Sequence, residues 1–212
     1  PKRVLFLKGS GNLGIIQNIT KLFFEKYGAT FAVGSSCDRL GEEGIIKAVG
    51  KSQILPIEEI KKGENIIIWG RNPYVTNPHL IPLIKNKQIL TIDVIKTETA
   101  KKSNYFYQIK PNRDIFLAKY LITKNREYLE KTGLKDVSIL ESMIKEGGVI
   151  LLGLGVSKNK WGDKTTETIF ALQNQNLKIA YLGDSTEGLN NPFNVNPKYT
   201  TPFFEIEWDN YD

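Results

Sequence analysis

The sequence predicts an α/β fold with mostly parallel strands. Short apolar runs rich in β-branched residues alternate with amphipathic stretches of helical spacing, a pattern typical of strands joined by helices. Several of the apolar runs end in glycine-containing loops, as strands of open parallel sheets do where they bind ligands. The chain of 212 residues is 41% hydrophobic and 25% charged, which is ordinary for a globular protein with a packed core.

The expected elements follow from these runs in chain order. The expected strands are Val4–Leu7, Thr30–Val33, Ile66–Trp69, Ile89–Asp93, Tyr105–Ile109, Val149–Leu152 and Lys178–Leu182. The expected helices are Leu13–Tyr27, Arg39–Val49, His79–Ile84, Asp114–Tyr128, Asp136–Lys145 and Lys164–Asn174. In the first helix, apolar residues at helical spacing predict one buried face, formed by Ile16, Ile19, Phe23 and Tyr27. The last thirty residues, rich in Asn, Pro and aromatics, are expected to form an irregular tail that wraps the body.

Charge and composition exclude several classes of protein. The net charge is +6, but the basic residues are scattered singly or in pairs, so we do not expect a nucleic-acid partner. No apolar run approaches the roughly 18 residues that a membrane-spanning helix needs. A single cysteine excludes internal disulfides and an iron–sulfur cluster held wholly by this chain. With one histidine, His79, there is neither a zinc ligand set nor a Cys–His pair in the sequence pattern.

The sequence opens with Pro1-Lys2-Arg3 and enters its first strand at once, without an initiating methionine. We therefore expect a piece of a longer polypeptide, whose other parts carry some of the function.

Three loops are built for close approach of the backbone to a ligand. They follow the first, third and sixth expected strands and span residues 7–14, 69–73 and 152–157. Loops of this kind before a helix present free N–H groups, which favours a phosphate-bearing ligand. Gly9-x-Gly11-x-x-Gly14 matches the dinucleotide fingerprint, but the second strand ends in Gly34 without the acidic residue that reads the ribose of NAD. A tight turn is the alternative role for these glycines.

Four further residues are candidates for chemistry. Asp93 ends a strand, where a carboxylate can bind a ribose or base, or else cap a turn. Asp114 could bind the donors of a guanine edge, or cap the following helix. Cys37 precedes a helix, which lowers a thiol's pKa, although a lone cysteine is more often a small apolar residue. His79 starts a helix and is expected to be solvated or to cap it.

Five segments, in order over most of the chain, carry a resemblance. Their sequences are G-S-G-N at 9–12, W-G-R-N-P with T-N-P-H at 69–79, I-D-V-I-K-T-E-T-A at 92–100, I-K-P-N-R-D at 109–114 and G-L-N-N at 188–191. They resemble the molybdopterin oxidoreductase family, whose motifs are G-S-G-N, W-G-x-N-P…T-x-P, I-D-P-R-x-T-x-T-A, P-G-T-D and G-Q-N-N.

This resemblance implies two Rossmann-like lobes that are interrupted in sequence and hold pterin-guanine dinucleotide between them. The first lobe would comprise residues 1–36 plus 147–212, and residues 37–146 would form a second lobe inserted in the first. Cys37 would lie where many members place the protein ligand to molybdenum. The nucleotide-binding positions would be Gly9, Ser10, Gly11 and Asn12 on one side, and Gly70, Asn72, Asp93 and Asp114 on the other.

The chain departs from the family at positions near the nucleotide. Val94-Ile95 stands in place of Pro-Arg, Asn112-Arg113 in place of Gly-Thr, and Asp38 follows Cys37. Such departures are similar to one branch of the family, the molybdopterin-like domain found in a peripheral-arm subunit of NADH-quinone oxidoreductase. There the domain is architectural, molybdenum is generally absent, and iron–sulfur clusters lie in other parts of the same polypeptide.

Three hypotheses remain. The first is an architectural domain of such a respiratory polypeptide, with a degenerate crevice and no committed cofactor, in contact with other subunits of a respiratory complex. This hypothesis places the protein in the cytoplasm, at the cytoplasmic face of the inner membrane. The second is a fragment of a true molybdenum enzyme with Cys37 as the metal ligand. The third is a mononucleotide-binding module that uses only the Gly9–Gly14 loop.

Overall fold

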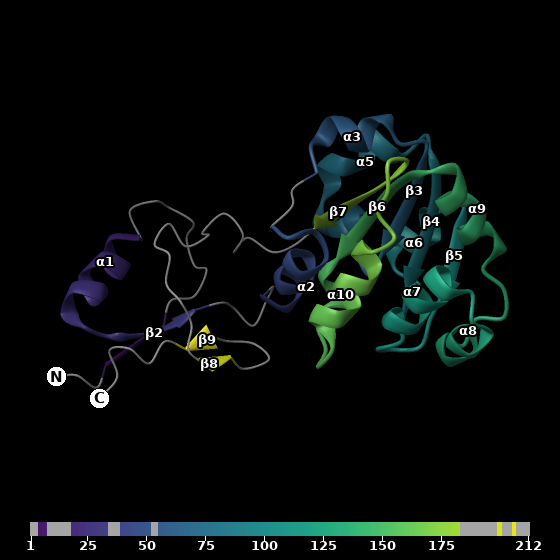
Figure 1. The fold of residues 1–212 in the computed structure, drawn as a ribbon. Coiled ribbons are helices and arrows are strands. Elements are labelled where there is room, and N and C mark those ends of the chain that lie inside the picture. Colours follow the sequence, from purple (N-terminus) through teal and green to yellow (C-terminus); the bar gives the residue numbers. More distant parts are fainter. Residues whose placement is uncertain are drawn as a thin grey trace. The chain divides into compact units, whose positions relative to one another are not determined.

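A computed structural model describes residues 4–7, 18–33, 39–51, 55–182, 199–200 and 205–206. The chain divides into two compact units: residues 1–40 with 183–212, and residues 41–182. The strands are β1 (Leu5–Leu7), β2 (Thr30–Val33), β3 (Asn65–Trp69), β4 (Gln88–Asp93), β5 (Tyr105–Gln108), β6 (Gly148–Gly153), β7 (Leu177–Leu182), β8 (Tyr199–Thr200) and β9 (Glu205–Ile206). The α/β fold class with mostly parallel strands is thereby confirmed (Figure 1).

Helices connect these strands. They are α1 (Asn18–Tyr27), α2 (Arg39–Val49), α3 (Ile57–Lys62), α4 (Pro73–Thr76), α5 (Ile81–Ile84), α6 (Glu98–Lys102), α7 (Asp114–Thr123), α8 (Arg126–Thr132), α9 (Ser138–Glu146) and α10 (Gly162–Phe170). The described residues also form two 3-10 turns, η2 (Pro78–Leu80) and η3 (Leu154–Val156). No helix in this described part of the chain is long and apolar enough to cross a membrane.

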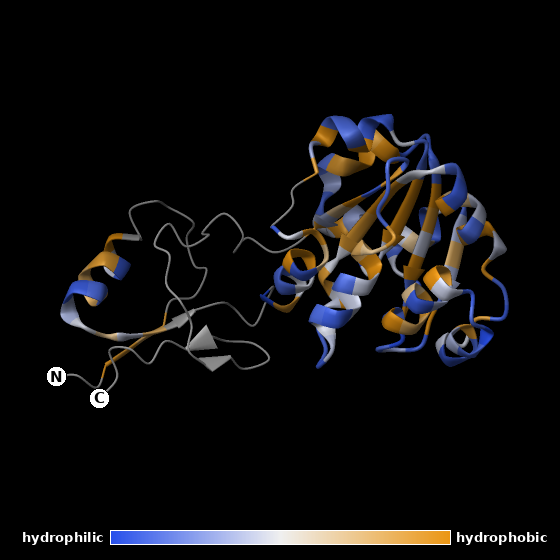
Figure 2. Ribbon diagram, in the orientation of Figure 1, coloured by the Kyte–Doolittle hydropathy of each residue, from blue (hydrophilic) through white to orange (hydrophobic). Residues whose placement is uncertain are grey.

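The larger unit is a five-stranded parallel sheet in the order β5-β4-β3-β6-β7. Along each strand, successive side chains point to opposite faces of the sheet, and both faces are buried. In β3, Ile67 and Trp69 contribute to one core together with residues of α2 and of α7 to α10, whereas Ile66 and Ile68 contribute to the other with α3 and α5. Figure 2 shows the apolar strands between helices whose surfaces are largely hydrophilic. This arrangement explains why the strands read as continuous apolar runs.

The boundaries between the two units of the structure differ from the lobe boundaries predicted from the sequence. Residues 147–182 were expected in the first lobe, but β6 pairs with β3 and β7 pairs with β6, so this segment completes the five-stranded sheet. The physical reason is that β6 is buried on both faces, as a strand is when it lies inside a parallel sheet that helices cover on both faces.

One expected helix is two helices in the structure. The predicted segment 114–128 is interrupted at Lys124, which adopts a left-handed conformation with φ of 58° and closes α7. Asn125 then caps α8, because its Oδ1 accepts the backbone N–H of Glu127 at 3.0 Å. The break matters for the site because it leaves α7 a short helix beside α10.

The smaller unit pairs β1 with β2 in parallel, and β2 with β9 in antiparallel orientation. Phe6 stacks on Phe24 of α1 at 4.7 Å between ring centroids, so Phe24 is the residue that faces the sheet. The predicted buried face of this helix is wrong at three positions: the side chains of Ile19, Phe23 and Tyr27 are exposed. The fourth, Ile16, lies outside the described residues, as does most of the predicted irregular tail.

Candidate functional site

The carboxyl edge of the five-stranded sheet gathers the four predicted nucleotide positions that the structure describes. Gly70 and Asn72 follow β3, Asp93 ends β4, and Asp114 follows β5. Because all these strands are parallel, their carboxyl ends meet at one edge. The predicted residues Gly9, Ser10, Gly11, Asn12 and Cys37 lie outside the described residues.

The loops after β3 and β6 pack directly against each other. Gly70 has a φ of +64°, and its carbonyl accepts the N–H of Gly155 at 3.2 Å. A Cβ on Gly153 would lie 2.2 Å from the same carbonyl oxygen. These strands flank the point where the strand order reverses, the usual position of a ligand crevice in such sheets. Glycine is therefore required here for contact between loops, in addition to any contact with a ligand.

Asn72 ties the β3 loop to α6. Its Oδ1 accepts hydrogen bonds from the N–H of Thr99 at 3.1 Å and from the Thr99 hydroxyl at 2.7 Å. Thr99 is fully buried, so the amide of Asn72 is held in one orientation. That orientation leaves the Nδ2 donors without a protein partner among the described residues.

Asp114 is turned into the core. Its Oδ1 accepts the indole N–H of Trp69 at 2.8 Å, and the residue is only 8% exposed. Burial raises the pKa of this carboxyl, and the nearby charge of Asp93 raises it further, against the lowering effect of the Trp69 hydrogen bond. Asp114 is the first residue of α7 and Arg113 occupies the N-cap position, so the alternative prediction that Asp114 caps this helix is wrong.

Asp93 remains partly open at the sheet edge. Its Oδ1 accepts the N–H of Val94 at 2.7 Å, as a turn-capping aspartate would. Burial raises the pKa of this carboxyl, while the backbone N–H groups of Val94 and Ile95 oppose the shift. The side chain combines a carboxylate at the carboxyl edge with incomplete burial, which leaves room for a ligand's donors.

Asn112 keeps a backbone conformation that suits glycine. Its φ is 59°, in the left-handed region that asparagine tolerates better than most residues. This position aligns with the glycine of the P-G-T-D motif in the resemblance described above. Asn112 therefore adopts a backbone conformation that a glycine could also adopt.

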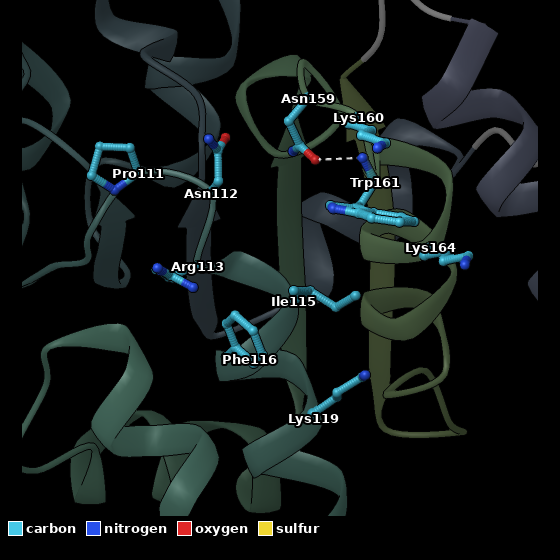
Figure 3. A pocket seen from close by; sticks show the side chains of 10 residues that line it. All are labelled: Pro111, Asn112, Arg113, Ile115, Phe116, Lys119, Asn159, Lys160, Trp161 and Lys164. Atoms are coloured by element: carbon cyan, nitrogen blue, oxygen red, sulfur yellow. Dashed lines mark hydrogen bonds between the residues drawn. The ribbon is translucent and has the colours of Figure 1, made fainter. Parts of the chain in front are cut away.

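A pocket that the sequence did not indicate opens between the first turns of α7 and α10 (Figure 3). We call it the cationic pocket; its volume is about 540 Å³. It is lined by Pro111, Asn112, Arg113, Ile115, Phe116, Lys119, Asn159, Lys160, Trp161 and Lys164. The lining contains four cations and no carboxylate. The four basic residues stand in two segments of the sequence, Arg113 and Lys119 in one and Lys160 and Lys164 in the other. No sequence pattern indicated that these two distant segments lie together.

Metal ligands do not cluster in the described part of the chain. No group of three or more His, Cys, Asp or Glu side chains among these residues could hold a metal ion. His79 lies in η2 with an exposed side chain, as the solvated alternative predicts.

Comparisons with known proteins give two distant relatives, and no family model matches the chain. The chain is 31% identical over 115 residues to the probable oxidoreductase YoaE of Bacillus subtilis (strain 168), covering 51% of this chain and 17% of that protein. It is 28% identical over 208 residues to the probable oxidoreductase YyaE of the same organism, covering 80% of this chain and 31% of that protein. The chain thus spans less than a third of either relative and is related, at this distance, to proteins named as oxidoreductases.

Proposed function

We propose that this chain is a cofactor-binding part of a larger oxidoreductase of the molybdopterin type. The carboxyl edge of the five-stranded sheet would bind the nucleotide portion of a pterin-guanine dinucleotide. The relatives named as oxidoreductases support the general activity, and the five motif segments support the type of cofactor.

The observation that carries this proposal is the state of Asp93. Its carboxylate stands at the end of β4, accepts the backbone N–H of Val94 through Oδ1, and is not fully buried. A carboxylate in this position can accept hydrogen bonds from ribose hydroxyls. The Nδ2 donors of Asn72 and the left-handed turn at Asn112 lie at the same edge and suit the acceptors and the backbone approach that a dinucleotide needs.

The described residues fit the guanine base of the proposed cofactor only in part. Asp114, which the resemblance assigns to guanine, gives Oδ1 to Trp69 and is nearly inaccessible. We therefore assign the ribose and phosphate portions to the described residues and leave the base unassigned. When bound, the molybdenum–pterin group supplies two-electron oxidation and reduction at the metal. Cys37 is the proposed metal ligand of this chain.

A second candidate is the architectural, molybdopterin-like domain of an NADH-quinone oxidoreductase. The observation that favours it is again Asp114, since a base-reading carboxylate committed to the core is what a degenerate crevice would contain. This candidate implies contacts with other subunits of a respiratory complex at the cytoplasmic face of the inner membrane. It requires neither nucleic acid nor direct insertion in the membrane.

The two candidates differ in cofactor content. The test uses the longest natural polypeptide that contains this sequence, made in cells that synthesise molybdopterin, with measurement of molybdenum, tungsten and the fluorescence of oxidised pterin. The proposal predicts near-stoichiometric metal and pterin, and loss of both in Asp93→Ala. Glu64→Ala is the matched control, because Glu64 is an exposed carboxylate just before β3, at the opposite edge of the sheet. Absence of metal and pterin from the parent protein would leave the architectural candidate.

A further inference from the structure

One side of α1, in the smaller unit, is apolar and exposed. Ile19, Phe23 and Tyr27 follow one another at intervals of four residues, about one helical turn, and are 66%, 62% and 44% exposed. Leu22 lies beside them and is exposed as well. We call these four residues the α1 stripe. A surface helix normally turns polar side chains to water, so an apolar stripe of this width indicates a surface that a partner covers.

The α1 stripe is not what holds α1 on its own sheet. The ring of Phe24 does this: it stacks on Phe6 of β1, and Phe6 meets Phe31 of β2 edge to face at 5.3 Å between ring centroids. Phe23 is turned by about 100° from Phe24 around the helix axis and stacks instead on Tyr27 at 6.1 Å. The helix therefore has one apolar side that packs within its own unit and a second that remains exposed.

The shape and charge of the α1 stripe favour a helical partner. Ile19, Phe23 and Tyr27 form one continuous ridge, and ridges with this four-residue spacing pack into the grooves of a second helix. Lys26 follows Leu22 by four residues, so it lies on the same side of α1, and it is exposed. Among the described residues Lys26 forms no ion pair. A helix that covers the stripe would gain from a carboxylate opposite this lysine.

The length of the relatives favours a partner within the same polypeptide. The chain matches 17% of one relative and 31% of the other, so more than two thirds of each relative lies outside the matched part. A segment joined to the same chain is present at a high effective concentration, and a contact of a few apolar side chains is then sufficient. A second copy would have to associate from dilute solution through the same small surface.

We infer that the α1 stripe docks an amphipathic helix from another part of the same polypeptide, with its apolar side on Phe23 and a carboxylate facing Lys26. The inference rests on the part of the proposed function that makes this chain a piece of a larger protein, and it does not depend on the cofactor.

Photocrosslinking in the longest natural polypeptide that contains this sequence tests the inference. The probe is p-benzoylphenylalanine in place of Phe23, a position whose exposure can accept the larger side chain. Irradiation should join the probe, within one molecule, to a helical segment outside these 212 residues, which peptide mass spectrometry identifies. Ile19→Asp should lower the yield of this product about fivefold or more, because it places a charge in an apolar contact. Lys26→Glu should lower it about twofold, and Lys26→Arg should retain it.

The same probe in place of Glu25 is the matched control. Glu25 is exposed and lies about 200° around the helix axis from Phe23, so it should give no product with that segment. With the probe at position 23, Glu25→Ala should leave the yield unchanged. A product between two copies, a product confined to these 212 residues, or no protein product from either position would overturn the inference.

Molybdenum and pterin are measured on the same preparations. Retained crosslinking without metal and pterin would overturn the proposed cofactor and support the docking helix. Metal and pterin without the crosslink would overturn the docking helix alone.

Discussion

Asn72, Asp93 and Asp114 each give a side-chain oxygen to a protein donor, whereas none of the four cations of the cationic pocket forms an ion pair among the described residues. Both groups of side chains lie at the carboxyl end of the same sheet. The first group is used to join loops and helices to one another, and only part of its hydrogen-bonding capacity is left over. The cations of the second group lie against aromatic rings of Phe116, Tyr128 and Trp161 instead.

A polar residue in a ligand motif can therefore serve the scaffold and the ligand together. Asn72 commits its oxygen to Thr99 and keeps its donors, while Asp114 is almost wholly committed to Trp69. Unpaired like charges, in contrast, repel one another and gain little until an anion arrives. Four experiments bear on this contrast, and we give them in decreasing order of the effect that we expect.

A substitution at the contact between the β3 and β6 loops should lower the free energy of unfolding most. In Gly153→Ala the new Cβ would meet the Gly70 carbonyl oxygen at 2.2 Å, so the backbone must shift, and we expect a loss of about 3 kcal/mol in the free energy of unfolding. Urea denaturation measures it. Gly50→Ala is the control, because no atom lies within 4 Å of the position that its new Cβ would take, and only the φ of +79° resists the change, at about 1 kcal/mol. Equal losses would contradict the close packing of these loops.

The Trp69–Asp114 pair should come next. Asp114→Ala leaves the buried indole N–H without an acceptor, which costs about 2 kcal/mol of unfolding free energy. Asp114→Asn keeps an acceptor of the same shape, so its loss should be less than half of that. Denaturant titrations of both variants distinguish a structural carboxyl from one reserved for a ligand. A stable Asp114→Ala variant would show that the pair does not matter to the fold.

The dependence of the unfolding free energy on pH should also reveal the buried carboxyl of Asp114. The pKa of Asp114 is raised in the folded protein, so between its ordinary value of about 4 and the raised value the folded state holds a proton that the unfolded chain releases. The contribution of Asp114 to stability therefore falls as the pH rises through this window. Asp114→Asn removes the titration, and its stability relative to the parent should rise with pH. A constant difference between the two proteins across the window would refute this assignment.

The smallest expected effect is the difference in stability between replacing an ion-paired lysine and replacing a lysine without an ion pair. The ion-paired lysine should cost more stability when it is replaced. Lys47 contacts Glu43 at 2.8 Å and Asp163 at 2.9 Å, and these bonds raise its pKa. Because Lys47 is 42% exposed, we expect Lys47→Met to lose only about 0.5 kcal/mol, and less at high salt. Lys119→Met should change stability by less than that. Thermal melts at low and high salt compare the two, and a larger loss at Lys119 would assign the pocket cations a structural role.

The sequence predicted the sheet well because the evidence for it was local. The apolar runs of β3, β4 and β6, the glycine that follows β3 and the glycine that ends β6 specify parallel strands and a ligand edge without knowledge of any partner segment. The buried face of α1 was predicted incorrectly, because several apolar stripes fit one helix and only the contact of Phe24 with Phe6 decides between them.

The site was predictable in part for the same reason. Asp93 and Asn72 could be placed at the sheet edge from their positions after strands. The hydrogen bond between Trp69 and Asp114 joins residues 45 apart in sequence, and the cationic pocket joins two segments that are just as distant. The first pairing depends on how α7 packs on β3 and the second on how α7 packs beside α10, which the periodicity of each helix does not determine.

The most direct test of the cofactor assignment measures molybdenum and pterin in Asp93→Ala and in Glu64→Ala of the longest natural polypeptide. The account predicts loss of both from Asp93→Ala and near-stoichiometric amounts of both in Glu64→Ala, whose carboxylate lies at the opposite edge of the sheet. Equal contents in the two variants would contradict the assignment of Asp93 to the cofactor.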